Sequence, residues 1–63
     1  MCESSVLIEK GSGRELLMEE VVHVAVDGDD IKFRGILGEA RSAKGRIKEI
    51  NLMKHTIVIE ECK

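Results

Sequence analysis

The chain has 63 residues, with 10 lysines and arginines against 12 aspartates and glutamates and a formal net charge of -2. Nucleic-acid binders usually combine a basic surface with stacking aromatic rings, so this acidic balance, with Phe33 as the only aromatic residue, argues against RNA as the main ligand. The chain has no run of about 20 apolar residues that could span a membrane, and its length predicts a single small domain over residues 1–63.

The first residues, Met1-Cys2-Glu3, place a thiol within chelating distance of the chain's own amino terminus. If Met1 is removed, the Cys2 amine and sulfur close a five-membered ring around a metal. If Met1 stays, its amine, the Cys2 backbone nitrogen and the Cys2 sulfur form two fused rings. Ni(II) and Cu(II) accept such donors in a square plane, whereas Zn(II) prefers a tetrahedron.

One chain offers only two or three of these donors, so two Cys2 residues related by a two-fold axis would complete the square. The backbone nitrogen of Glu3 is a further candidate donor. The simpler interpretation is that Cys2 is a small residue near a strand, as cysteines near chain ends commonly are.

Valine and isoleucine dominate the apolar residues and proline is absent, which favours strands. The segment Glu3–Glu9 predicts a strand with Val6 and Ile8 on one face and Leu7 on the other. The turn signal Lys10-Gly11-Ser12-Gly13 then ends this strand.

The segment Arg14–Val26 has two interpretations. Its valines alternate with polar or small residues, which predicts a short strand at Arg14–Met18, a bend near Glu19-Glu20 and a second strand at Val21–Val26. Its leucines and valines also have helical spacing, which leaves a helix over Arg14–Val22 as the alternative.

Asp27-Gly28-Asp29-Asp30 is the clearest hairpin turn in the chain. In the strand that follows, Ile31 and Phe33 alternate with charged residues and are expected to face the core. Gly35 and Gly38 bracket a bend or bulge of the kind that curls a small sheet toward a barrel.

Two more strands are predicted before the last hairpin, a short exposed one at Glu39–Lys44 and one at Arg46–Leu52 with a bulge near Lys48-Glu49. A loop at Met53–His55 leads to the final strand, Thr56–Glu60. About six or seven short antiparallel strands with turns every eight to twelve residues predict an all-β barrel or sandwich.

Lys44, Arg46 and Lys48 are the only local basic run, and alternation places them on one face. They form either a solvated strand face or a surface for RNA phosphates or an acidic partner protein. His23, in a valine-rich strand, is expected to be packed or at a rim, and His55 to be exposed in its loop. Either imidazole could join a metal site if it approached Cys2.

Cys62 could lie near Cys2 if the first and last strands pair, and is otherwise a tail residue without a role. No basic and apolar leader stands before Cys2, so we expect a cytoplasmic protein. No nucleophile triad, phosphate loop or metalloprotease motif is present, so an enzyme is not expected.

Five segments, in order along nearly the whole length of the chain, carry a resemblance to a known family. They are Met1–Ser4, Leu17–Val21, Gly38-Glu39, Ala43–Leu52 and Thr56–Glu60. On these segments the chain resembles the CooT-like family of small nickel-binding proteins. The resemblance implies an SH3-like β-barrel, a homodimer, and Ni(II) bound through the second-position cysteine, here Cys2. It also implies a role as a metallochaperone or nickel store for the maturation of a nickel enzyme such as carbon monoxide dehydrogenase. The family was earlier described as RNA-binding, which rests on fold analogy alone.

Overall fold

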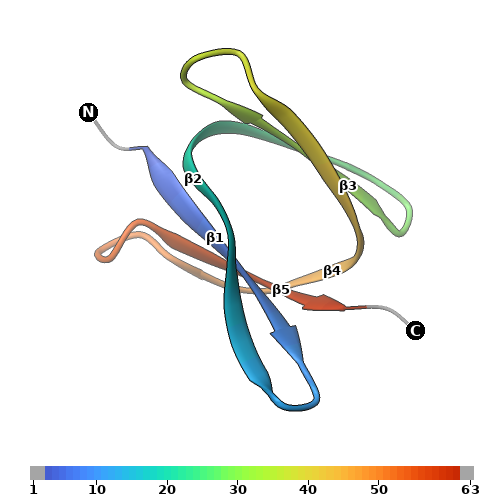
Figure 1. Cartoon of the computed structure of the whole chain (residues 1–63). Coiled ribbons are helices and arrows are strands. Elements are labelled where there is room, and N and C mark those ends of the chain that lie inside the picture. Colours follow the sequence, from blue (N-terminus) through green and yellow to red (C-terminus); the bar gives the residue numbers. More distant parts are fainter. Residues whose placement is uncertain (1–2, 62–63) are drawn as a thin grey trace.

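The computed structural model describes residues 3–61, and within them all regular structure is β-strand (Figure 1). The strands are β1 (Ser4–Lys10), β2 (Gly13–Asp27), β3 (Asp30–Gly35), β4 (Ala40–Asn51) and β5 (Thr56–Glu61). Each strand pairs with the next, and β1 also pairs with β5, so the sheet closes into a barrel. This confirms the predicted all-β barrel. The part of the chain that the structure describes contains no helix long and apolar enough to cross a membrane.

The strand count is five, not the predicted six or seven, because β2 and β4 each change partner along their length. β2 pairs with β1 as far as Val21 and with β3 from Val21 onward. β4 pairs with β3 as far as Lys44 and with β5 from Gly45 onward. The sequence predicts each half as a separate strand, but in both β2 and β4 the strand continues from one partner to the next. The helical alternative for Arg14–Val22 is wrong, since this segment is hydrogen-bonded to β1.

The bend in β2 is at Glu20, where φ is 57°, in the left-handed region that side chains other than glycine seldom adopt. The Glu20 carbonyl oxygen accepts a hydrogen bond of 2.9 Å from the Ile36 amide, which ties the bend to the turn after β3. The predicted bend near Glu19-Glu20 is confirmed. The bend lets β2 pair with β1 in its first half and with β3 in its second half.

The barrel core follows the predicted alternation of apolar residues. Val6 and Ile8 of β1 are buried while Leu7 between them is only half-buried, and Ile31 and Phe33 of β3 are almost completely buried. The buried set also contains Met18, Val21, Val58 and Ile59. Burying a side chain of this size contributes about 1.5–3 kcal/mol to the stability, so the burial of these side chains stabilises the closed barrel.

One pair of strands, β1 with β5, is parallel, whereas the sequence predicts antiparallel pairing throughout. The reason is geometric. Strands joined by hairpins alternate in direction, so a ring with an odd number of them must close with a parallel pair. As a consequence, β1 and β5 both begin at the same end of the barrel, with Ser5 opposite Thr56.

Candidate functional site

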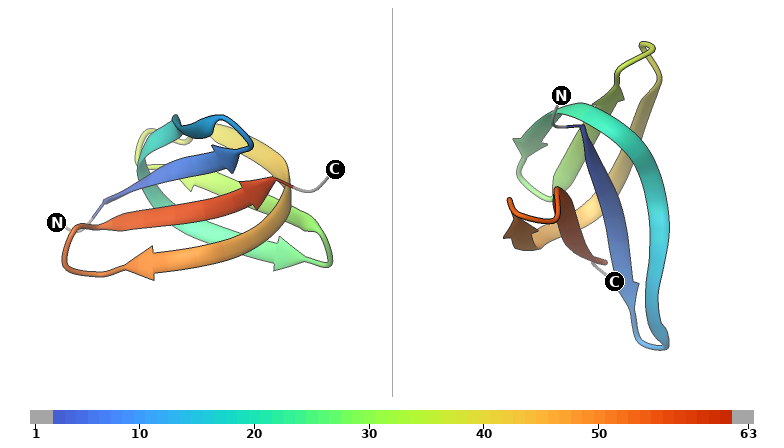
Figure 2. Two further views of the ribbon diagram at one scale, coloured as in Figure 1. Left: turned by 90° about the horizontal axis from the view of Figure 1, so that it is seen from below. Right: turned by 90° about the vertical axis from the view of Figure 1, so that its left-hand side faces the viewer.

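The beginning of β1 is held between two other parts of the chain. Ser4 pairs with Val21, beside the bend of β2, and the Ser5 amide donates a 2.8 Å hydrogen bond to the carbonyl oxygen of His55. Figure 2 shows the start of β1 beside the turn that joins β4 to β5. The half-buried Glu3 comes directly before this strand. Cys2, the predicted thiolate ligand, is the preceding residue in the sequence and lies outside the described residues, as does Cys62.

Glu3 lies at the edge of a small pocket of about 240 Å³ in which the start of β1 faces the second half of β2. His23 lines the same pocket, so the fold brings this imidazole to the end of the barrel where the chain begins. The sequence predicts that His23 is packed or at a rim, and the structure shows it exposed. No pattern in the sequence signals its proximity to Glu3. The proximity depends on the register that sets Ser4 opposite Val21.

His55 is exposed, as the sequence predicts, and its φ of 52° places it in the left-handed region at the end of the turn between β4 and β5. Its backbone contact with Ser5 puts it at the same end of the barrel as Glu3 and His23. Neutral imidazole is a common metal ligand. Within residues 3–61, no group of three or more histidine, cysteine, aspartate or glutamate side chains is arranged to hold a metal ion.

Exposed apolar side chains lie near the start of β1. Val22 of β2 is 53% exposed, and in the turn after β4 Leu52 and Met53 are 79% and 91% exposed. Val22 also lines the pocket at Glu3. Large apolar side chains gathered at one place on a small protein can form an interaction surface. Other large apolar side chains are also exposed within residues 3–61, such as Leu16 and Val26 in other parts of β2, at 55% and 58%.

The parallel pairing of β1 with β5 bears on the two cysteines. Because both strands begin at the same end, Glu3 and Glu61, the outermost described residues, lie at opposite ends of the pair. Cys2 and Cys62 themselves lie outside residues 3–61, so their predicted proximity stays a prediction.

The basic run on β4 carries carboxylate partners at all three positions. These ion pairs are Lys44 with Asp30 at 3.6 Å, Arg46 with Glu60 at 3.7 Å, and Lys48 with Glu9. Hydrogen bonds from Lys48 and then Arg14 lower the pKa of the Glu9 carboxyl below its usual value. Much of the positive charge of this surface is thus compensated within the chain, and its use for RNA or a partner protein stays a prediction.

Three comparisons relate the chain to known proteins. The family model described as CO dehydrogenase accessory protein CooT matches residues 1–60. An uncharacterised protein of Methanothermobacter thermautotrophicus is 40% identical over 60 residues, which cover 95% of this chain and 89% of that protein. An uncharacterised protein of Archaeoglobus fulgidus is 42% identical over 43 residues, or 68% of this chain and 96% of that protein. A crystal structure assigned to CooT from Carboxydothermus hydrogenoformans superimposes with a TM-score of 0.89 at 29% identity, covering 98% of this chain and 100% of the other.

Proposed function

Because the chain belongs to the CooT family, whose members are described as CO dehydrogenase accessory proteins, we propose that it binds Ni(II) through Cys2 and stores or delivers the ion for the maturation of a nickel enzyme such as carbon monoxide dehydrogenase. The family is one of accessory proteins, so the chain is an accessory protein and not itself the enzyme. The observation that carries the proposal is the match over residues 1–60, which includes Cys2.

Ni(II) is the cargo in this proposal, and the chemistry of the first residues suits it. The Cys2 thiolate and an adjacent amine or amide nitrogen form a small chelate ring, and a square plane of sulfur and nitrogen is a geometry that Ni(II) accepts. The backbone nitrogen of Glu3 is a further donor within the same segment. Both thiol and amine must lose a proton, so affinity falls as the pH falls.

The proposal includes a homodimer, in which two chains each supply one Cys2 to a shared ion. What supports it is the apolar rim near the start of β1, with Val22 on one side and Leu52 and Met53 on the other. Covering this rim with a second copy would remove apolar surface from water and bring two chain starts toward each other. A chain of 63 residues also gains stability from such a partner, because a small domain buries little of its surface alone.

The test is nickel affinity measured by equilibrium dialysis on untagged, reduced protein, since a tag at the amino terminus would block the amine donor. The Cys2→Ser variant should lose tight binding and keep the melting curve of the unaltered protein. Cys62→Ser is the matched control, because it removes a thiol from the other end of the chain. This variant should bind nickel as tightly as the unaltered protein. Unchanged affinity in Cys2→Ser, or an equal loss in Cys62→Ser, would contradict the proposal.

A further inference from the structure

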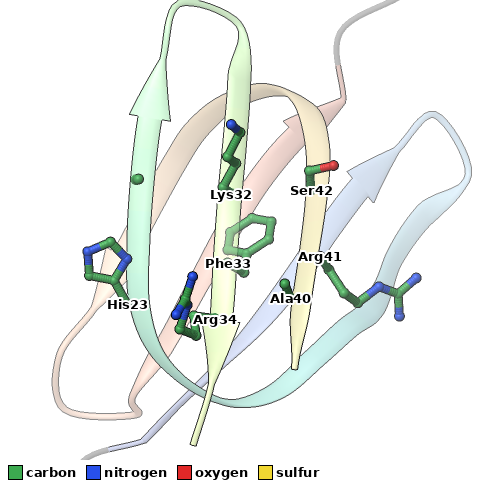
Figure 3. A pocket seen from close by; sticks show the side chains of 8 residues that line it. His23, Lys32, Phe33, Arg34, Ala40, Arg41 and Ser42 are labelled. Carbon is green, nitrogen blue, oxygen red and sulfur yellow. The ribbon is translucent and has the colours of Figure 1, made fainter. Parts of the chain in front are cut away.

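A shallow hollow of about 380 Å³ lies on the outer face of β2, β3 and β4 (Figure 3). Six of its eight lining residues come in two rows across the strands, and Phe33 and Arg41 complete the lining. One row is Ala25, Lys32 and Ser42, and the other is His23, Arg34 and Ala40. In each row a long cation on β3 stands beside at least one small side chain, and His23 is the one larger neighbour in the two rows. The small side chains leave the space of the hollow, and the side chains of Lys32 and Arg34 extend outward from β3.

The positive charge of this hollow is uncompensated. Within the described part of the chain, neither Lys32 nor Arg34 forms an ion pair with a carboxylate, although five other lysines and arginines do. Arg41 lines the hollow but does not place its charge there, because its guanidinium points away (Figure 3) and donates a 3.0 Å hydrogen bond to the carbonyl oxygen of Leu17. In a chain with a net charge of -2, two unpaired cations on adjacent outward positions of one strand form a local site for anions.

The spacing of Lys32 and Arg34 indicates how far apart the negative groups of a ligand should be. Lys32 and Arg34 are two residues apart on one strand, so their Cα atoms are separated by about 6.6 Å. An extended peptide carries alternate side chains at this same spacing. Carboxylates at alternate positions would therefore meet Lys32 and Arg34 in register, and the Arg34 guanidinium suits a carboxylate in a bidentate pair. The alanines and Ser42 leave room for the peptide backbone.

Nucleic acid fits the hollow less well. Single strands are bound largely by stacking of bases on aromatic rings, and Phe33, the only aromatic residue, is 1% exposed. The net charge of -2 also opposes a long polyanion.

We propose that the hollow around Lys32 and Arg34 is a docking site for an acidic, extended segment of a partner protein, with carboxylates at alternate positions. The hollow shares only His23 with the pocket at Glu3, and its two cations do not line that pocket. Binding at the hollow does not depend on nickel. It uses cations other than the paired ones of β4, which are Lys44, Arg46 and Lys48.

The experiment measures fluorescence anisotropy of a labelled peptide with alternating glutamate and threonine, added to the metal-free protein. The double variant Lys32→Gln/Arg34→Gln should weaken binding by at least about tenfold, since each charged hydrogen bond contributes about that factor. The matched control Lys44→Gln/Arg46→Gln removes the same charge from β4 and should change the affinity by less than about twofold. The peptide in which glutamine replaces glutamate should not bind.

A second measurement needs no variant. Amide shifts of the unaltered protein, followed by nuclear magnetic resonance during peptide titration, should move at Ala25, Lys32, Arg34, Ala40 and Ser42. Three results would overturn the proposal: no peptide binding, equal losses in the two double variants, or tighter binding of an oligothymidine than of the peptide. Shifts confined to another face would overturn it as well.

Discussion

Replacing Glu20 with glycine should stabilise the protein, because the bend of β2 holds this residue at a φ of 57°. For a residue with a Cβ atom, the left-handed conformation costs about 1–2 kcal/mol, and glycine is free of this cost. Glycine also loses more backbone entropy on folding, which offsets about 0.5–1 kcal/mol. The Glu20 side chain is exposed and makes no ion pair within residues 3–61, so little else is lost. The net gain is at most about 1.5 kcal/mol, with a central value of about 0.75 kcal/mol.

Thermal unfolding followed by circular dichroism measures this gain. For a chain of this size, a gain of about 1 kcal/mol raises the melting temperature by about 4–8 °C. Glu20→Ala is the control, because it removes the carboxylate and keeps the strained backbone, and it should melt within about 2 °C of the unaltered protein. A Glu20→Gly protein that melts below Glu20→Ala would refute the strain at this bend.

Two further changes test the core and the ion pairs. Phe33→Ala should cost about 3–5 kcal/mol, a large share of the roughly 3–9 kcal/mol by which a domain of this size is stable, and should therefore lower the melting temperature sharply. A cooperative melt near that of the unaltered protein would contradict this. Lys48 and Arg14 lower the pKa of Glu9, so its pairs stabilise the fold above its ordinary pKa of 4.5 and are lost as the pH falls through the lowered value. The urea concentration at the unfolding midpoint should therefore drop less between pH 7 and about pH 3 in Glu9→Gln than in the unaltered protein. Equal drops in the two proteins would contradict a stabilising role for the ion pairs of Glu9.

Much of the barrel is readable in the sequence, because buried and exposed residues alternate along its strands. The alternation at Val6 and Ile8, and again at Ile31 and Phe33, identifies the inward faces without knowledge of any partner strand. The Asp27–Asp30 hairpin is equally local, with Gly28 at a φ of 64° in its two-residue loop. Local pattern and turn chemistry are sufficient for such features.

The features that sequence reasoning missed depend on which strands become neighbours. The change of partner within β2 and β4 merges segments that the pattern separates. The pocket shared by Glu3 and His23 depends on the register of β1 against β2. Lys48 reaches Glu9 across 39 positions, which no local spacing reveals. The unpaired charge of Lys32 and Arg34 becomes visible only after the pairs elsewhere are known.

The measurement that tests nickel binding most directly is a Ni(II) titration of the untagged, reduced protein, followed by ultraviolet–visible absorption with mass spectrometry to establish whether Met1 is present. A Cys2 thiolate bound to Ni(II) should produce a sulfur-to-nickel charge-transfer band that grows linearly. The band should saturate at roughly one nickel ion per two chains, as a shared site on a two-fold axis requires. Saturation at one ion per chain would contradict the shared site, and the absence of any such band would contradict nickel binding through Cys2.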